Sequence, residues 1–378
     1  QKDPAIQDMP TVEQQQNSLL KLNQLQLIAS HNSYRLRTRD SVLIMLNYLY
    51  NTGTLPANLN PRGLDYEHLP FDAQMSDYGI RGVEIDIYND PQGGAFANRQ
   101  MNSLFQAPVA SGVAALNAPG FKVLHIKDVD YNTHYYTFVQ ALKALKTWSD
   151  AHPNHLPLFV NIETKSDAPG DNATLAGMGF LPAPLFDAAA ADALDAEIKS
   201  VFGANLDKII TPDKLRGNLN SLNDVVTQKK YPTLGEARGK IIFIIEGAVL
   251  PFYTAAHPSL KNRAAFIYAT AGTPEAVFLL LNNAVASKAT IASRVNEGYI
   301  VRTRADGDTE QARTGDYTAM NAAFESGAQI ISTDYYRADP RGGIDSNWTT
   351  YKVRFPNGEI GRKNPVNATA INVQSDLK

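Results

Sequence analysis

Residues 156–166 read LPLFVNIETKS, an apolar run that ends in polar and charged side chains. Residues 158–160 are continuously apolar, which is typical of a strand buried on both faces of a parallel sheet. Asn161, Glu163 and Lys165 follow at every second position, so they share one face of that strand. The stretch therefore predicts a parallel strand with chemically active groups at its carboxyl end.

Similar apolar runs recur along the chain and alternate with helical patterns. The runs cover residues 25–29, 82–87, 123–126, 156–162, 208–211, 241–245, 299–301 and 329–331. Helical spacing or helix-capping residues mark 136–152, 187–202 and 316–326, and the last two end at glycines. Alternating strands and helices predict a single-domain α/β fold, an irregular TIM-type (β/α)₈ barrel. An open doubly wound sheet is the structural alternative.

The domain boundaries follow from the same pattern. We expect an N-terminal arm over 1–23, which is polar and rich in glutamine, and a barrel over 24–338. Residues 339–378 are rich in Gly, Asn and Pro and predict an irregular tail packed on the barrel. Residues 34–80 and 247–298 are expected to be insertions, the second mostly helical.

Composition excludes several classes of protein. The 378 residues include no cysteine, which rules out disulfides, thiolate nucleophiles and cysteine-bound zinc. Thirty-five Lys and Arg face 38 Asp and Glu, so broad capture of nucleic acid is not expected. The most apolar stretch, 241–253, is interrupted by Glu246 and Pro251, so we expect no transmembrane segment. We expect a monomer that is secreted or periplasmic.

Polar groups stand where four successive apolar runs end. They are His31 and Asn32, then Glu84 and Asp86, then His125, then Asn161 and Glu163. In a parallel barrel the carboxyl ends of the strands form the active-site mouth. Crowded carboxylates with an amide oxygen suit a hard cation, Ca²⁺ or alternatively Mg²⁺, and histidines suit acid–base chemistry. The set predicts metal-assisted cleavage of a negatively charged ester.

Each of these residues also has an ordinary structural interpretation. A histidine at a strand end is often a hydrogen-bonded structural residue. Glu163 has Lys165 or Lys127 as alternative ion-pair partners. Glu246 ends another apolar run and is a further candidate for the site. The joint placement at consecutive strand ends is what favours a functional site.

The order of these motifs resembles the phosphatidylinositol-specific phospholipase C superfamily, and more closely its bacterial calcium-dependent branch. The segments that carry the resemblance are IASHNSYR (28–35), RGVEIDIY (81–88), VLHIKDVD (123–130), LPLFVNIETKS (156–166), RGKIIFIIEG (238–247), VRTRAD (301–306) and GAQIISTDYY (327–336). They span most of the chain. The resemblance implies an irregular TIM-type barrel that cleaves the phosphodiester of phosphatidylinositol.

The resemblance also implies residue roles. The catalytic histidines correspond to His31 and His125, and the calcium ligands to Asn32, Glu84, Asp86 and Glu163. Calcium-independent relatives carry an arginine in place of the metal. The resemblance further implies that the inositol 2-hydroxyl attacks phosphorus, that a carboxylate or one histidine removes its proton, and that the other histidine, His125, protonates the diacylglycerol oxygen. The product is a cyclic inositol phosphate, which is then open to hydrolysis.

Further contacts are expected around the substrate, a phospholipid reached transiently at a membrane surface. Candidates for binding its phosphate or sugar are Lys127, Lys165, Arg302, Arg304 and Tyr335. Arg302 and Arg304 alternate on a predicted strand, so both can face the mouth, although a surface ion pair with Asp306 or Asp334 is the alternative. Asp128 and Asp130 are close enough in sequence to His125 to be further metal contacts.

Three other functions remain open on the sequence. A glycerophosphodiester or sphingolipid phosphodiesterase would use the same barrel, although glycerophosphodiesterases typically carry His-Arg-Gly where this chain has His-Asn-Ser-Tyr. A barrel glycosidase would need two carboxylates, such as Glu163 and Glu246, and no His31. A non-catalytic barrel that binds head groups would need no turnover.

Overall fold

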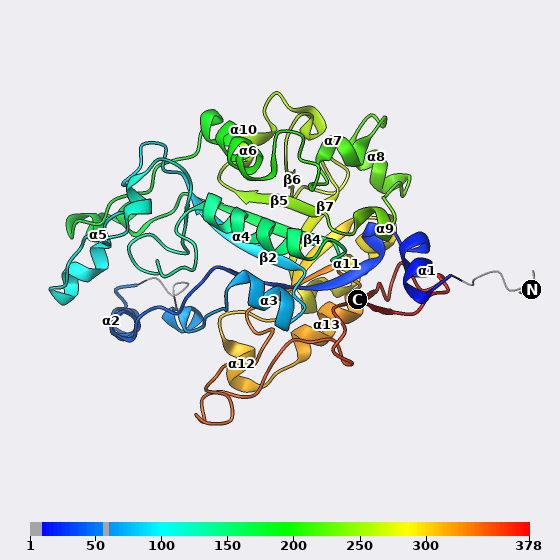
Figure 1. The fold of residues 1–378 in the computed structure, drawn as a ribbon. Helices are drawn as coiled ribbons and strands as arrows, with labels where there is room; N and C mark the ends of the chain where they lie inside the picture. The colour runs from blue at the N-terminus through cyan, green and yellow to red at the C-terminus, as the bar shows by residue number, and fades with distance from the viewer. Residues whose placement is uncertain (1–9, 56–59) are drawn as a thin grey trace, which may run out of the picture.

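Eight parallel strands form an irregular TIM-type barrel, as predicted (Figure 1). The computed structural model describes residues 10–55 and 60–378. The barrel strands are β1 (Leu25–Ser30), β2 (Gly82–Tyr88), β4 (Leu158–Lys165), β5 (Ile241–Gly247), β6 (Phe266–Ile267), β7 (Phe278–Asn283), β8 (Ile300–Arg304) and β9 (Ile330–Thr333). They pair in the order β6-β5-β4-β2-β1-β9-β8-β7. A parallel bridge between Tyr268 and Phe278 links β6 to β7 and nearly closes the ring.

Helices surround the strands. They are α1 (Val12–Leu19), α2 (Asp40–Asn51), α3 (Phe71–Asp77), α4 (Phe138–Ala151), α5 (Ala173–Gly177), α6 (Ala188–Phe202), α7 (Pro212–Arg216), α8 (Leu222–Thr227), α9 (Leu234–Ala237), α10 (Leu250–Thr254), α11 (Ala284–Glu297), α12 (Glu310–Thr314) and α13 (Thr318–Ser326). Thr137 and Gln140 cap α4 reciprocally, and Asp187 caps α6. Gly203 ends α6 with φ of 84°, where a glycine is favoured.

Two of the predicted strands are not barrel strands. Residues 123–126 contribute only Val123 to β3 (Lys122–Val123), which pairs antiparallel with the end of β2. Residues 208–211 form no strand, and Ile209 makes a bridge to Ile241. Their places in the barrel are taken by β6 and β7, which lie inside the expected helical insertion 247–298. The predicted number of strands was right, but two of their positions were wrong.

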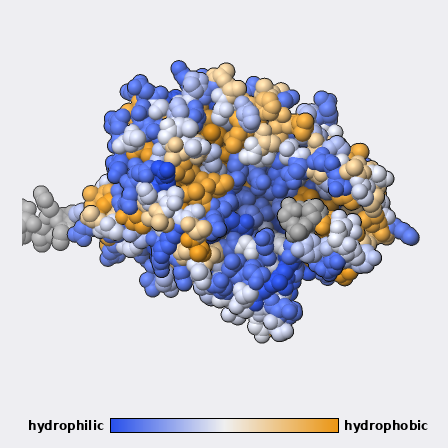
Figure 2. All heavy atoms as spheres, turned by 180° about the vertical axis from the view of Figure 1, so that it is seen from behind, coloured by the Kyte–Doolittle hydropathy of each residue, from blue (hydrophilic) through white to orange (hydrophobic). Residues whose placement is uncertain are grey.

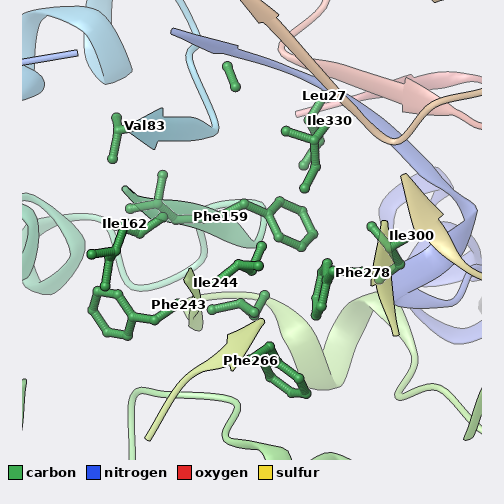
Figure 3. Close-up of a cluster of buried hydrophobic side chains, with 14 of the residues drawn as sticks. Leu27, Val83, Phe159, Ile162, Phe243, Ile244, Phe266, Phe278, Ile300 and Ile330 are labelled. Atoms are coloured by element: carbon green, nitrogen blue, oxygen red, sulfur yellow. The ribbon is translucent and has the colours of Figure 1, made fainter. Parts of the chain in front are cut away.

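The barrel interior is apolar at the amino ends of the strands (Figure 3). Phe159 of β4 meets Phe278 of β7 edge-on at 6.2 Å between ring centroids, and Phe278 meets Phe266 at 5.0 Å. All three are at most 2% exposed. Full burial of one such ring contributes about 1.5–3 kcal/mol to folding. This packed layer is the floor beneath the polar residues at the carboxyl ends.

Helix α1, near the start of the described residues, meets the C-terminal segment near the amino ends of the strands. α1 lies beside α9, and the Gln16 amide donates to the carbonyls of Gln374 and Asp376. β10 (Gly361–Lys363) pairs antiparallel with β1, and β11 (Asp376–Leu377) pairs with β10. In Figure 1, α2 and α5, which follow β1 and β4, lie at the opposite end of the molecule. The loops that carry α2 and α5 are thus separate from α1 and the C-terminal strands.

Among the residues that the structure describes, we find no helix with the length and apolar character needed to span a membrane.

Candidate active site

Strand register gathers carboxylates at the carboxyl ends of β2, β4 and β5. Asp86 pairs with Glu163, and Glu163 pairs with Glu246. One layer deeper, Glu84 pairs with Asn161. Residues two apart on a strand face the same way, so all five groups share one face of the sheet. Seen from behind, the molecule is hollowed near its centre, and hydrophilic residues gather around the hollow (Figure 2).

Three of these carboxylates are close enough to bind one ion. Glu84, Asp86 and Glu163 each offer an oxygen, and these oxygens all lie within 4.8 Å of one another. Burial raises the pKa of Asp86 well above its usual range, and the charge of Glu163 raises it further. A bound cation would relieve both effects. The structure therefore brings together the three carboxylates expected as ligands.

The fourth expected ligand, Asn32, faces the same cluster. It follows β1 in the left-handed region, with φ of 47°. Its side-chain oxygen is 3.2 Å from Glu84 Oε1 and 3.1 Å from Asp86 Oδ1, while Nδ2 donates to the Tyr66 hydroxyl at 3.1 Å. In this orientation of the amide, acceptor oxygens this close repel one another unless a cation lies among them, and a 180° turn of the amide would also remove the repulsion. An all-oxygen donor set of this kind fits Ca²⁺.

Two basic side chains partly balance the cluster. Lys165 Nζ lies 3.6 Å from Asp86 Oδ2 and 4.0 Å from Glu163 Oε1. Arg302 bonds to Glu84 and lies 3.5 Å from Glu246 Oε1. When every group is ionised, the four carboxylates Glu84, Asp86, Glu163 and Glu246 carry four negative charges, and the two basic side chains carry two positive charges. A divalent metal ion would neutralise the two negative charges that remain. Burial opposes ionisation of Glu84, but Arg302 holds the pKa of Glu84 below its usual value.

His31 lies at the edge of this cluster and is held by an aspartate. Its Nδ1 is 2.7 Å from Asp334 Oδ1, and Nε2 is 3.6 Å from Glu84 Oε1. Arg304 Nη2 is 3.0 Å from the other oxygen of Asp334. The carboxylate thus fixes the ring through Nδ1 and leaves Nε2 toward the cluster, which is how a histidine is oriented for proton transfer or for binding an anion.

His125 is held in the same way by a second aspartate. Its Nδ1 is 2.8 Å from Asp130 Oδ2, which also accepts from Arg35 Nε at 2.8 Å. Burial lowers the pKa of His125 to about 4, and the nearby charge of Lys165 adds to this effect. Asp130 is therefore an orienting partner of His125. Asp128 pairs with Lys127, so both aspartates that were expected as additional metal contacts have other partners in this structure.

The five expected substrate contacts divide into two groups. Lys165, Arg302 and Arg304 are joined to the cluster or to the histidine pairs. Arg304 is paired with Asp334, but within the site rather than on the surface. Lys127 Nζ instead bonds to Asp128 and to the carbonyl of Leu181. Tyr335 is 3% exposed, and its hydroxyl has no hydrogen-bond partner among the described residues.

Sequence reasoning missed two residues of the site, Asp334 and Tyr66, and did not predict the partner of Asn161. Asp334 directly follows β9, so the strand-end rule that selected His31 would also have selected Asp334 as a site residue. Asn161 was placed on the correct face, and its Nδ2 is now seen to donate to Glu246 Oε1 at 2.7 Å. Tyr66 lies in the insertion before β2, where no pattern in the sequence indicated a role.

Comparisons with known proteins agree with this geometry. The family model for Ca²⁺-dependent phosphoinositide phospholipase C matches residues 20–365. The chain therefore belongs to that family, and it is an enzyme of the phosphodiesterase class. A search of curated protein sequences gave no match.

Solved structures show the same fold. A calcium-dependent phosphoinositol-specific phospholipase C from Pseudomonas sp, in a myo-inositol complex, aligns with a TM-score of 0.54 and 14% identity, covering 94% of this chain and 100% of that chain. Another crystal form of that enzyme gives 0.53 and 14%, with 91% and 99% covered. These similarities confirm the predicted barrel.

Proposed function

We propose that the protein cleaves phosphatidylinositol to diacylglycerol and a cyclic inositol phosphate in a Ca²⁺-dependent reaction. The observation that carries this proposal is the placement of two His–Asp pairs beside one cluster of oxygen ligands. Asn32, Glu84, Asp86 and Glu163 would hold the ion. When bound, the ion would lower the pKa of the inositol 2-hydroxyl and offset the phosphate charge.

The two histidines would have different roles in the reaction. His31, fixed by Asp334, would hydrogen-bond the phosphoryl oxygens as negative charge develops. His125 would donate a proton to the departing diacylglycerol oxygen. In the free protein burial holds the pKa of His125 at about 4, so the ring is neutral near pH 7. The negative phosphodiester beside it would raise that pKa on binding and let the ring take up the proton.

The proton of the 2-hydroxyl would pass to a group within the site. A carboxylate of the ligand cluster or one of the two histidines would remove it. Lys165 and Arg302 each pair with two carboxylates and would meet the substrate's charge or hydroxyls from the same positions. Arg304 would orient Asp334 and so the His31 ring.

The lipid specificity is also part of this proposal. Glycerophosphodiesters and sphingolipids are the alternative substrates, because the same acid–base groups would serve their phosphodiesters. Family membership favours phosphoinositides and argues against the barrel glycosidase and the non-catalytic binding barrel. Several expectations stay predictions. They are a monomeric protein that meets its lipid at a membrane surface, a secreted or periplasmic location, Mg²⁺ as an alternative to Ca²⁺, and the division of the chain into three parts at residues 23 and 338.

Product analysis tests the mechanism. Phosphorus NMR of reactions on phosphatidylinositol, glycerophosphoinositol and sphingomyelin would follow the products over time, and the His125→Asn variant would be compared with His152→Asn. His152 stacks on Trp148 at the end of α4, apart from the site, and is the matched control. We expect a cyclic phosphodiester from phosphatidylinositol in the wild type and in His152→Asn, and almost none in His125→Asn. A non-cyclic phosphomonoester as the first product would contradict attack by the 2-hydroxyl.

A further inference from the structure

The Tyr66 hydroxyl lies next to the Asn32 amide and close to the His31 ring. Tyr66 is 3% exposed and Asn32 is 1% exposed, so neither side chain can rely on solvent for its hydrogen bonds. Asn32 Nδ2 donates to the Tyr66 oxygen at 3.1 Å, and that oxygen is also 3.4 Å from His31 Nδ1. Tyr66 therefore touches both an expected cation ligand and an expected catalytic ring, although it lies far from them in sequence.

The Asn32 amide has two orientations that this site can satisfy. In the orientation described above, its oxygen faces Glu84 and Asp86 and its NH₂ group donates to Tyr66. A rotation of the amide by 180° would let the NH₂ group donate to Glu84 Oε1 at 3.2 Å and Asp86 Oδ1 at 3.1 Å. The amide oxygen would then accept from the Tyr66 hydroxyl at 3.1 Å. The first orientation suits a bound cation and the second suits its absence.

A tyrosine hydroxyl serves both orientations because it is a donor and an acceptor at once. The phenol keeps its proton near pH 7, because the ordinary pKa of a tyrosine is about 10. The ring is also fixed. The Arg35 guanidinium lies 4.3 Å from the ring centroid and bonds to the Tyr66 carbonyl, and His68 packs edge-on at 5.5 Å.

We propose that Tyr66 is a positioning residue for the cation site: its hydroxyl accepts from the Asn32 amide when a cation is bound and donates to it when the cation leaves. This inference rests on the proposed Ca²⁺ site. It adds a residue that never touches the ion, and it explains why Asn32 can present its oxygen to two carboxylates. Without the hydroxyl, the NH₂ group of the ligating orientation would be buried without a partner, which is unfavourable.

Ca²⁺ affinity, measured by titration calorimetry on the metal-free protein, tests the proposal. Loss of an outer partner of a ligand typically weakens metal binding by about 10–100-fold, so Tyr66→Phe should bind Ca²⁺ at least about tenfold more weakly than the wild type. Tyr231→Phe is the matched control, since its buried hydroxyl has no hydrogen-bond partner among the described residues. Tyr231 also lies away from the proposed cation site. The carbonyl of its neighbour Pro232 accepts from Leu22 N, which precedes β1, and the length of β1 puts this contact about 20 Å from the carboxyl end of that strand.

A double-mutant cycle shows whether Tyr66 acts through Asn32. In an Asn32→Ala background, adding Tyr66→Phe should weaken Ca²⁺ binding less than twofold. Equal losses in both backgrounds, or a Tyr66→Phe affinity within twofold of the wild type, would overturn the inference. A wild-type protein that binds no Ca²⁺ would instead overturn the cation site of the proposed function, so the two failures are distinguishable.

A measurement on the wild type tests the reorientation of the Asn32 amide even if Tyr66→Phe does not fold. Labelling with ¹⁵N-asparagine gives side-chain NH₂ signals in NMR, and the Asn32 pair is assigned by its loss in Asn32→Ala. We expect this pair to shift on Ca²⁺ addition, because its acceptors change from two carboxylates to one hydroxyl. An Asn32 pair that is unchanged at saturating Ca²⁺ would refute the reorientation of the amide.

Discussion

Replacing Lys165 with methionine should make the stability of the protein depend more strongly on Ca²⁺. Lys165 supplies positive charge to Asp86 and Glu163, the same carboxylates that are proposed to hold the ion. Methionine keeps much of the apolar stem and removes the charge. In metal-free protein the two carboxylates would then repel each other without compensation, whereas Ca²⁺ would supply the missing charge.

The size of the effect follows from the burial of the pair. Lys165 and Asp86 side chains are 10% and 0% exposed, and removing one partner of a buried pair costs about 3–5 kcal/mol. Asp86 can take up a proton, since burial and Glu163 raise its pKa, so we expect the lower end, about 3 kcal/mol. With an unfolding entropy of about 2.1 cal/mol/K per residue, 378 residues give a loss of about 4 °C in Tm.

Thermal unfolding in excess chelator and in Ca²⁺ checks this prediction. Lys127→Met is the matched control, because the Lys127 side chain is also largely buried, in a 2.8 Å pair with Asp128 outside the ligand cluster. Both variants should lose stability in chelator. Ca²⁺ should restore more than half of the loss in Lys165→Met and none of it in Lys127→Met. Equal Ca²⁺ responses in the two variants would refute the placement of the ion beside Lys165.

Three other predictions concern the histidines and their partners. His125→Asn should lower kcat by about 10²–10⁴-fold with little change in KM, and a loss below tenfold in steady-state assays would contradict its role as the acid. Asp334→Asn should lower kcat by about tenfold or more with folding retained, because the His31 ring loses its charged anchor; circular dichroism and kinetics together check this. Burial lowers the pKa of His155 to about 4, so the unfolded chain binds its proton first and stability falls as pH drops from about 6.5 to about 4. The difference in unfolding free energy between pH 7 and pH 5 should therefore be about 2 kcal/mol smaller in His155→Gln, and an unchanged difference in urea titrations would contradict it.

The sequence predicts the site better than it predicts the complete barrel. The change from apolar to polar residues at a strand end selects Asn32, Glu84, Asp86 and Glu163, because strand alternation and the common direction of parallel strands force these groups together. Residues 278–283 were missed as a strand, since continuous apolar runs within a long predicted insertion do not distinguish strand from helix.

Pairings through loops could not be predicted. His125 was expected at the end of a barrel strand, but it reaches the mouth because β3 runs back antiparallel along β2. Its partner Asp130 and the Tyr66 hydroxyl depend on loop geometry that no period in the sequence encodes. Tyr66 is placed by Arg35 and His68, both of which are themselves positioned by the folded insertion.

The most direct test of the central claim is the release of water-soluble inositol phosphate from phosphatidylinositol vesicles. The wild type would be assayed with Ca²⁺ and with excess chelator, and His31→Ala with Ca²⁺. We predict release that requires Ca²⁺ and that His31→Ala lacks. Release that persists in chelator would contradict the cation site, and no release in any condition would contradict phosphatidylinositol as the substrate.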